Sequence, residues 1–478
     1  MPNAPQSEGA TPSAGRYRAL RFVLAMRSLR GDKGERVSAL SALPGIPLLA
    51  TSFRTLVGPA EFRTTLLSLI EQATTRILLS TLYLQDDDAG REVLNALYAA
   101  KERCPTLDIA VFVDWHRAQR GLIGKKASAG NAAMYTEMAI RCGSGVPIYG
   151  VPVQTRELMG VLHLKGFVID DTVLYSGASL NDVYLYRHDR YRLDRYHLID
   201  SRQLADSMAA LMNRVLRAQP AVCSLDTSPR PKTGVLRGDI QRLRRTLAKS
   251  GYTLTAGTIR AGEVGLTPLL GFGASDNSLN RVIVQLIQRA QRHLVLLTPY
   301  FNLPGPIRRA VDEKIGQGCQ VTIIIGDKTA NDFYIPPHEC FSTIGALPYL
   351  YENNLRRFCK MHQAAVSAGK LNLRLWKHAQ HTFHLKGLLV DDDYALLTGS
   401  NLNPRAWRLD LENGLLLHDP QGLLCDQHQR ELAAILMHSR RLTHYDDLDP
   451  LDSYPLPAQR LLKRLARTRA DRLINQVL

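Results

Sequence analysis

Two long stretches of the chain repeat the same succession of amphipathic and apolar segments. Residues 69–85 read LIEQATTRILLSTLYLQ, and residues 286–302 read LIQRAQRHLVLLTPYFN. In each stretch the apolar positions first recur at helical spacing and then run together for the length of one buried strand. We therefore predict the end of an amphipathic helix followed by a buried strand in both places.

The succession continues in parallel beyond these segments. Each stretch carries a helical pattern, a second apolar strand and a third strand, and the corresponding ranges are 89–103 and 305–317, 107–114 and 319–327, and 148–154 and 371–377. Alternating helices and strands predict an α/β sheet covered by helices. Because the chain holds two large copies rather than many short ones, we expect a duplicated domain and not a solenoid.

A polar line follows the third strand and is itself repeated. HLKGFVIDD occupies residues 163–171, and HLKGLLVDD occupies residues 384–392. On a strand, a His and a Lys two positions apart project from the same face, and the Asp pair favours a turn. A return strand then leads to a Gly and an Asn, which are Gly177 and Asn181 in one copy and Gly399 and Asn403 in the other. Each half thus presents a His, a Lys and an Asn at the edge of a predicted hairpin.

These residue types suit displacement at a phosphodiester or pyrophosphate. Attack builds charge on the phosphoryl oxygens, which fixed cations and donors must stabilise. In-line displacement suits two imidazoles on opposite sides, one as nucleophile and one as general acid and base. The catalytic candidates are His163 and His384, and the candidate phosphate-binding residues are Lys165, Lys386, Asn181 and Asn403. A purely structural role for the two histidines is the weaker alternative.

Length and composition fit a globular protein of two halves. At 478 residues the chain exceeds one hydrophobic core, while 45% hydrophobic and 22% charged residues are ordinary values. We expect a disordered lead-in over 1–15, a first half over 16–225, a linker with a basic segment over 226–262, a second half over 263–450 and a basic amphipathic helix over 451–478.

The net charge of +16 and the pI near 9.6 indicate a polyanionic partner. An anionic membrane surface is one such partner, and nucleic acid or a ribosome is another. Three segments are basic and amphipathic, namely 16–30, 237–251 and 456–478. Each suits a membrane interface, although a helix docked on the protein with a solvated basic face explains the same pattern.

No apolar run reaches 18 residues, and the Pro- and Ser-rich start has no apolar core followed by a cleavage site. We therefore expect neither a membrane span nor a secretory signal. The predicted location is cytoplasmic, with peripheral association with the inner membrane.

Signals for a metal are weak. The seven cysteines form no C-x-x-C, and Cys359 with His362 matches no standard zinc spacing, so buried reduced thiols are the favoured interpretation. The run Asp86-Asp87-Asp88 is expected to cap a helix beginning near Ala89 rather than to bind an ion. We expect no metal and no cofactor, because catalysis through a covalent histidine needs neither.

The pattern H-x-K-x-x-x-x-D followed by Gly and Asn, present in both copies, resembles the phospholipase D superfamily. That family usually has G-S-x-N, whereas this chain has GASLN over 177–181 and GSNLN over 399–403, with the Asn one place later. With HLKG and DD in both copies, this departure resembles one branch, the bacterial phosphatidylserine synthases of the CDP-diacylglycerol–serine phosphatidyltransferase kind. The resemblance covers roughly residues 20–450.

The resemblance implies a fold and a reaction. The fold is α/β, with two mixed sheets flanked by helices, related by a pseudo-twofold axis, and with the active site between the halves. The reaction is transfer of a phosphatidyl group from CDP-diacylglycerol to L-serine through a phosphatidyl-histidine, releasing CMP. Each chain holds both half-sites, so the chemistry requires no oligomer.

Other functions remain open at this point. Cardiolipin synthase, phospholipase D and nuclease activities belong to the same superfamily. A degenerate, non-catalytic binding module is a further alternative, but the presence of both His, both Lys and both Asn argues against decay.

The resemblance also implies roles for three acidic residues. The family has a Glu after its Asn that is hydrogen-bonded to the opposite His; Glu412, within RAWRLDLENG, is the candidate, and we expect it to face His163. This favours His163 as nucleophile and His384 as general acid and base. Asp170 and Asp391 complete the two catalytic motifs and are expected to stabilise the hairpins without touching substrate.

Two segments near the motifs have open roles. The first copy reads YRHDRYRLDRYHL over 186–198 where the second has its Glu. Its Tyr and Arg residues either hold a lipid phosphate or nucleotide or pack on one another; they are, with Tyr184 just before them, Tyr186, Arg187, Arg190, Tyr191, Arg192 and Tyr196. The segment 331–358 opens like a loop and is predicted to form a lid or an entrance for acyl chains.

Overall fold

The structure is a computed structural model of the chain and describes residue 40 and residues 43–121, 130–143 and 145–467. Residues from Pro44 onward form one compact unit, which is described below. The predicted lead-in over 1–15, the basic segment 16–30 and the last part of the C-terminal segment, 468–478, lie outside the described residues.

The first half of this unit is built on a mixed sheet, whose eight strands in the described part of the chain have the order β10-β5-β4-β3-β6-β7-β9-β2. Strands β3, β4 and β5 are parallel, and β6 runs antiparallel to β3. The strands are β2 (Phe53–Thr55), β3 (Arg76–Ser80), β4 (Asp108–Asp114), β5 (Ile148–Val151), β6 (Gly166–Ile169), β7 (Thr172–Ser176), β9 (Tyr196–Asp200) and β10 (Cys223–Ser224).

The second half repeats this arrangement. Its sheet, nine strands within the described ranges, has the order β1-β11-β18-β17-β16-β12-β13-β14-β19. From β11 to β19 it matches the first sheet read from β2 to β10, as the duplication predicts. The strands are β1 (Ile46–Leu49), β11 (Glu263–Phe272), β12 (His293–Thr298), β13 (Gln320–Gly326), β14 (Leu371–Trp376), β16 (Gly387–Val390), β17 (Tyr394–Thr398), β18 (Leu411–His418) and β19 (Ser439–Arg441).

Strand β1 crosses the expected boundary between the halves. It precedes the first half in sequence, yet Ile46 pairs with Leu266 in the antiparallel ladder of β1 with β11. The second half therefore contains one strand, β1, that comes before the first half in the sequence. The sequence does not indicate this exchange, because a strand's own residues do not specify which of two sheet edges it joins.

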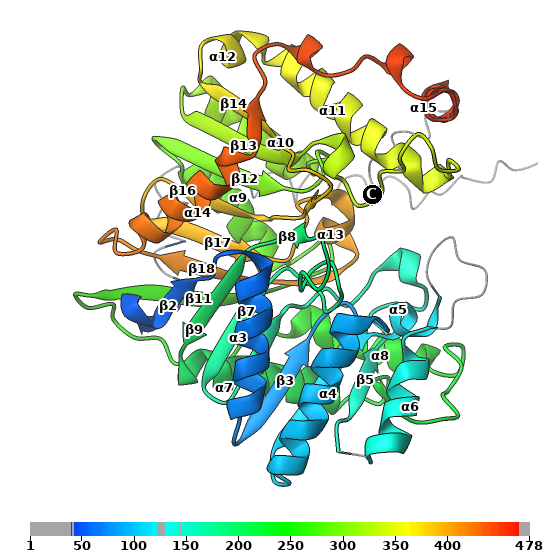
Figure 1. Ribbon diagram of the computed structural model, residues 1–478. Helices are drawn as coiled ribbons and strands as arrows, with labels where there is room; N and C mark the ends of the chain where they lie inside the picture. The colour runs from blue at the N-terminus through cyan, green and yellow to red at the C-terminus, as the bar shows by residue number, and fades with distance from the viewer. Residues whose placement is uncertain (1–39, 41–42, 122–129, 144, 468–478) are drawn as a thin grey trace, which may run out of the picture. The chain divides into compact units, whose positions relative to one another are not determined.

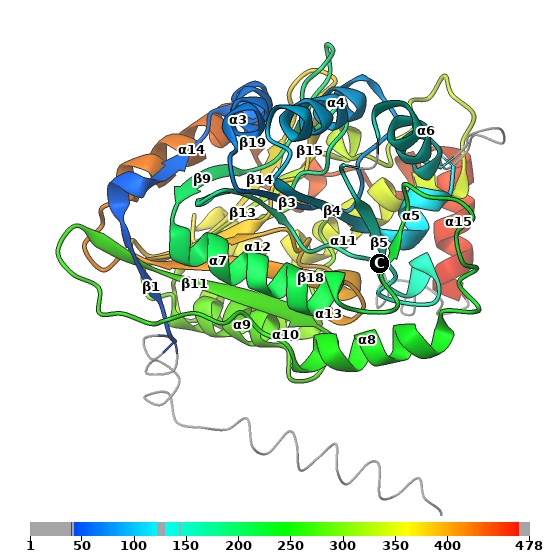
Figure 2. The same cartoon turned by 90° about the horizontal axis from the view of Figure 1, so that it is seen from below.

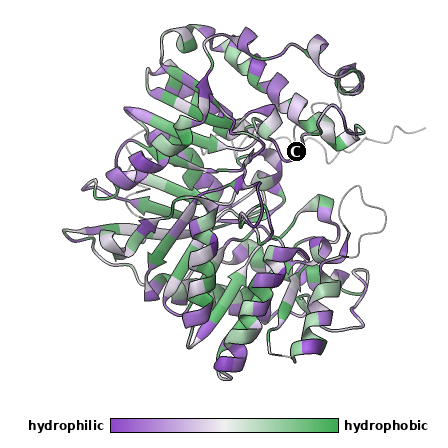
Figure 3. Ribbon diagram, viewed as in Figure 1, coloured by the Kyte–Doolittle hydropathy of each residue, from purple (hydrophilic) through white to green (hydrophobic). Residues whose placement is uncertain are grey.

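Helices cover the sheets, and strands form the core. Figure 2 shows α3, α4 and α6 on one face of the first sheet and α7 on the other. Strand residues such as those of β3 and β16 are buried in continuous runs, as expected where both faces are covered, and Figure 3 shows the hydrophobic residues gathered on the strands. The helices are α3 (Gly58–Gln72), α4 (Asp88–Arg103), α5 (Trp115–Gln119), α6 (Ala132–Cys142), α7 (Arg202–Leu211), α9 (Ser278–Arg289), α10 (Gly305–Gly316), α11 (Leu347–Met361), α12 (Gln363–Ser367), α13 (Pro404–Arg408) and α14 (Cys425–Met437).

Helix α4 begins at the acidic run, as predicted. Asp87 is its N-cap, and the Asp87 carboxylate accepts a hydrogen bond of 2.9 Å from the backbone N–H of Gly90. Such a bond satisfies one of the amide groups left open at a helix start.

The two described basic helices are docked on the protein. Helix α8 (Arg237–Lys249) buries Ile240, Leu243 and Leu247, and α15 (Leu456–Arg467) buries Ala458 and Leu462. The apolar faces of α8 and α15 are therefore largely buried against the protein. Any attraction of these helices for anions comes from their charged faces. Among the described residues, no helix is both long and apolar enough to cross a membrane.

Short cross-connections join the two halves. Strands β8 (Arg192–Leu193) and β15 (Thr382–Phe383) pair in parallel, and Leu162 forms an isolated parallel bridge with Leu411. In Figure 1, β8 lies between the larger sheets of the two halves. The two connections are equivalent under the pseudo-twofold relation. Each lies directly before the histidine of an HLKG motif.

Candidate active site between the halves

The cross-connections fix the two motif histidines by their backbones. The N–H of His163 donates to the carbonyl of Leu411 over 2.9 Å, and the N–H of His384 donates to the carbonyl of Leu193 over 2.8 Å. Each histidine is thereby held against a strand of the opposite half. An acidic residue comes directly after the leucine in both strands.

On one side this residue is Glu412. The Nδ1 of His163 lies 2.9 Å from the Oε2 of Glu412, and both side chains are buried. Burial raises the pKa of Glu412 well above its usual range, while burial together with Lys165 and Lys386 lowers the pKa of His163 well below its usual range. The imidazole is thus neutral at physiological pH, and its other nitrogen, Nε2, is available for attack on phosphorus.

On the other side the residue is Asp194, which sequence reasoning missed. The Nδ1 of His384 lies 3.1 Å from the Oδ2 of Asp194. A signal was present, because Leu193-Asp194 matches Leu411-Glu412. It was hidden because Asp194 follows Asn181 by thirteen residues, whereas Glu412 follows its Asn by nine.

The surroundings of the two histidines differ. The Nδ1 of His384 also lies 2.8 Å from the hydroxyl of Tyr184 and 2.5 Å from the Nζ of Lys386. Burial, followed by the charge of Lys386, lowers the pKa of His384 to about 4. Burial opposes ionisation of Asp194, but Lys386 outweighs it and keeps the pKa of this carboxyl below its usual range. Asp194 therefore remains a carboxylate.

The two lysines complete a buried cationic centre. The Nζ of Lys165 donates to the carbonyl of Ala178 and the hydroxyl of Ser179, each over 3.1 Å, and the Nζ of Lys386 donates to Asp194 over 2.7 Å. Burial and the charge of Lys386 lower the pKa of Lys165 to about 7. Such a pair favours an anion between the lysines, because two buried like charges raise each other's energy.

The glycine after each motif makes room for the lysine of the opposite half. A Cβ on Gly177 would lie 2.7 Å from the Nζ of Lys386, and a Cβ on Gly399 would lie 2.8 Å from the Cγ of Lys165. Side chains at these positions would collide with catalytic candidates, so the absence of a Cβ is what the site requires.

The two asparagines order the loops that follow them. The Oδ1 of Asn181 accepts a hydrogen bond of 3.1 Å from the N–H of Tyr184, and the Oδ1 of Asn403 accepts one of 2.9 Å from the N–H of Ala406. Their role as phosphate ligands remains a prediction.

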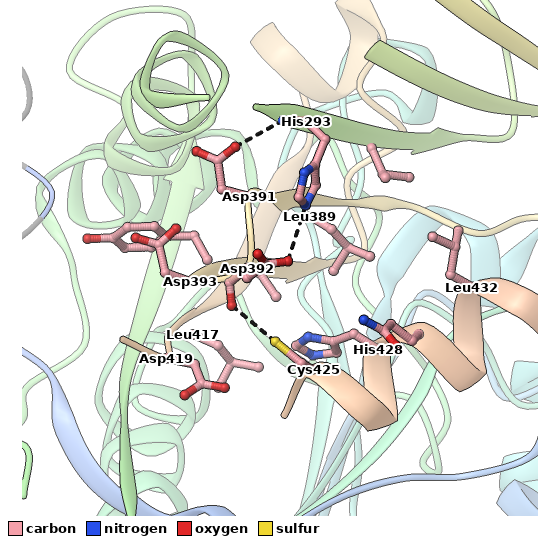
Figure 4. A pocket seen from close by; sticks show the side chains of 14 residues that line it. His293, Leu389, Asp391, Asp392, Asp393, Leu417, Asp419, Cys425, His428 and Leu432 are labelled. Carbon is pink, nitrogen blue, oxygen red and sulfur yellow. Dashed lines mark hydrogen bonds and ion pairs between the residues drawn. The ribbon is translucent and has the colours of Figure 1, made fainter. Parts of the chain in front are cut away.

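The motif aspartates lie at the far ends of their hairpins. Asp170 accepts hydrogen bonds from the backbone N–H groups of Thr75 and Arg76, and Asp391 accepts one from the N–H of His293. Burial acts to raise the pKa of Asp170, but these bonds outweigh it and lower the pKa to about 2. The four residues of β6, a span of about 13 Å, separate Asp170 from the lysine end of the motif. Figure 4 shows Asp391 beside His293 in a pocket whose lining does not include His384.

Some residues of the Tyr- and Arg-rich segment 186–198 lie near the active site, and others are buried in the core. Arg192 lies over the ring of Tyr184, 5.1 Å from its centroid, and Arg192 Nη1 is 3.6 Å from Asp332. Tyr196 is buried against Phe62 at a centroid distance of 4.7 Å, so of the two roles left open for this segment, Tyr196 takes the one of packing. Tyr196 is the first residue of β9, whose first two side chains are both buried.

Segment 331–358 begins beside the site and then becomes helical. Asp332 accepts a hydrogen bond of 2.5 Å from the hydroxyl of Tyr300, whose ring lies 6.2 Å from that of His384. From Thr343 the chain forms a 3₁₀ turn and then α11, which buries Tyr349 and Tyr351. A lid or acyl entrance remains a prediction for the loop before it.

Outside this site, most cysteine and histidine residues that could bind a metal lie apart from one another. Cys359 is buried, while the Nε2 of His362 lies 3.0 Å from Asp312. All seven cysteines lie in the described residues and are free thiols, but only Cys319 and Cys359 are buried. The expectation of buried thiols was wrong for Cys142 and Cys340, which are exposed, and does not hold for the other three, which are half-buried. Within the described ranges, three potential ligand atoms come together only at Asp88, Asp182 and His188, near the surface.

Comparisons with known proteins agree with this geometry. The family model described as "Cardiolipin synthase, PLD-like domain" matches residues 283–436. The CDP-diacylglycerol–serine O-phosphatidyltransferase of Haemophilus influenzae is 48% identical over 92% of this chain and 97% of its own length. The corresponding Escherichia coli protein is 49% identical over 92% of this chain and 97% of its own length.

A solved structure agrees as well. The crystal structure of phosphatidylserine synthase from Haemophilus influenzae superposes with a TM-score of 0.90 at 46% identity, covering 94% of this chain and 100% of that one. The chain therefore belongs to the bacterial CDP-diacylglycerol–serine O-phosphatidyltransferase family, within the phospholipase D superfamily.

Proposed function

We propose that the chain transfers the phosphatidyl group of CDP-diacylglycerol to L-serine, giving phosphatidylserine and CMP, through a covalent phosphatidyl-histidine. The observation that carries the proposal is the pair of buried histidines, each held at Nδ1 by a carboxylate of the opposite half, in a chain that matches this family over 92% of its length. Holding Nδ1 directs both Nε2 atoms to the substrate.

In the first step the Nε2 of His163 attacks the phosphatidyl phosphorus. The bond from phosphorus to the bridging oxygen breaks, and CMP departs with the electron pair. The Nδ1–H of His163 stays on its hydrogen bond to Glu412. The positive charge that develops on the imidazole favours the ionised form of Glu412, and this carboxylate stabilises the imidazolium. Lys165 and Lys386 meet the charge on the phosphoryl oxygens.

In the second step serine replaces CMP. Nε2 of His384 takes the proton of the serine hydroxyl, the serine oxygen attacks phosphorus, and the bond to His163 breaks. A pKa of about 4 keeps the imidazole of His384 neutral near pH 7 in the free protein, so its Nε2 can accept a proton. The first step demands little acid, because a phosphate group with a second pKa near 6 leaves readily.

Exchange of labelled CMP into CDP-diacylglycerol tests the mechanism. His163→Ala should abolish both exchange and serine transfer, since both pass through the same intermediate. Substantial exchange in this variant would refute the covalent role of His163. An acceptor screen with serine, glycerol, phosphatidylglycerol and water tests the substrate, and a plasmid-nicking assay tests the nuclease alternative.

The proposed location is peripheral, on an anionic membrane surface. The lipid donor requires access to a bilayer, and the exposed cationic faces of α8 and α15 favour anionic lipid. Nucleic acid remains an alternative partner for the same charge.

A further inference from the structure

An aromatic cluster made from both halves lies where β8 pairs with β15, just before His384 in the chain. The rings of Tyr191 and His381 stack with centroids 3.7 Å apart and planes at 17°, and the hydroxyl of Tyr191 lies 2.8 Å from the Nδ1 of His378. The N–H of Thr382 donates to the carbonyl of Tyr191 over 3.0 Å. The pairing of β8 with β15 therefore fixes this cluster relative to His384, which is three residues further along.

Tyr186 stands perpendicular to this stack. Its ring lies 5.2 Å from Tyr191 at 83° and 6.2 Å from His381 at 88°. It is nevertheless 38% exposed. Its backbone has a φ of 48°, which a bulky residue rarely adopts and which persists only where the surrounding structure holds it. The result is a large ring held firmly and partly open to solvent.

The pseudo-twofold relation is broken at this place. The segment before His163 reads ELMGV over 157–161, where the segment before His384 carries His378 and His381. Leu158 and Met159 there are 64% and 49% exposed. One flank of the site is therefore aromatic, next to the basic loop 186–192, and the other flank is aliphatic.

We propose that Tyr186 is the platform on which the cytosine base of the CDP group stacks, and that Tyr191 and His381 hold it in position. This inference rests on the proposed function and adds a nucleotide subsite to it. Bases stack on tyrosine faces, and the arginines of the same loop suit the adjoining phosphate. Three extended residues, about 10 Å, separate His381 from His384, and the ring of Tyr186 lies 6.2 Å from that of His381.

The subsite sets the direction of the reaction. With the base on the His384 flank, the CMP oxygen leaves toward His384. In-line displacement then requires attack from the opposite side, where His163 lies. The bond from phosphorus to the CMP oxygen breaks as the bond to Nε2 of His163 forms, which agrees with the roles assigned from Glu412.

Competitive inhibition by CMP tests the platform. Tyr186→Ala should raise the inhibition constant for CMP about 10- to 100-fold, the usual effect of losing one stacked base. Tyr186→Phe should keep it near the wild-type value, because the ring remains. Inhibition by inorganic phosphate, which lacks a base, should be the same in all three proteins. The KM for CDP-diacylglycerol should rise in Tyr186→Ala with little change in kcat.

A matched control is Trp407→Ala, which removes a partly exposed ring from α13 on the other half. It should leave inhibition by CMP unchanged. Unchanged inhibition by CMP in Tyr186→Ala, or loss of inhibition by CMP in Trp407→Ala instead, would overturn the inference.

Tyr186→Leu, which retains bulk without a π face, serves if the alanine variant fails to fold. A wild-type protein that releases no CMP from CDP-diacylglycerol would refute the proposed function, whereas an active protein with unaffected variants would refute the platform alone.

Discussion

At the scale of residues, two identical motifs carry histidines with different partners. The Nδ1 of His163 meets one buried carboxylate, whereas that of His384 meets Asp194, Tyr184 and Lys386. The repeat in the sequence conceals this difference, because the partners come from outside the repeated line. A nucleophile and a base need different electrostatic surroundings, and the structure supplies them.

Two conservative substitutions separate the steps. Glu412→Gln keeps an acceptor for His163 but cannot ionise as positive charge develops on the imidazole, so CMP exchange and serine transfer should both fall about 100-fold. Asp194→Asn acts on His384 and should slow serine transfer more than exchange. Steady-state transfer and isotope exchange measure the two effects. Identical ratios in both variants would contradict the assignment of roles.

The pH dependence follows from the buried groups. Lys165 must be protonated to bind the phosphoryl oxygens, and its pKa is about 7, so kcat/KM for CDP-diacylglycerol should fall as pH rises through about 7. His163 must be neutral to attack, and its pKa is lowered well below the usual range, so the acid limb should lie well below pH 6.5. A rate profile from pH 4 to 9 measures both limbs. A kcat/KM that stays constant from pH 7 to 9 would contradict the state of Lys165.

At the scale of elements, the motif aspartates join the hairpin to the neighbouring strand. Asp170 binds the backbone that enters β3, so Asp170→Ala should lower the free energy of unfolding by about 2–4 kcal/mol through lost charge-assisted bonds. The kcat of the folded fraction should change little. Chemical denaturation and active-site titration separate the two quantities. A large loss of kcat at unchanged stability would show a catalytic role instead.

The elements and the motifs were predictable, but their partners were not. Helical and strand periodicity placed α4, α10, β4 and β13 within a residue or two, because buried strands and amphipathic helices have strong local patterns. Asp194 and the route of β1 were missed for a common reason. Both depend on which distant strand lies alongside, and four additional residues between Asn181 and Asp194 disguise the correspondence with Glu412.

At the scale of the whole chain, the excess positive charge is expected to act at a membrane surface. Arg460 and Arg467 are exposed on α15. Since each basic residue near anionic lipid contributes about 1 kcal/mol, changing both to Gln should weaken binding to vesicles containing phosphatidylglycerol about 30-fold. Cosedimentation measures this, and raised salt should release the wild-type protein. Binding that resists salt and the double substitution would indicate apolar insertion instead.

The position of β1 has a consequence for how the polypeptide behaves when broken. The chain passes between the halves twice, once after β1 and again between β10 and β11. Strand β1 pairs with β11 at the edge of the second sheet. A nick in the stretch 226–234 would therefore leave two pieces that still share a ladder of backbone hydrogen bonds. The cleaved protein should therefore stay assembled as two fragments. Continued turnover after such a cut would show that the β1–β11 pairing holds the fragments together.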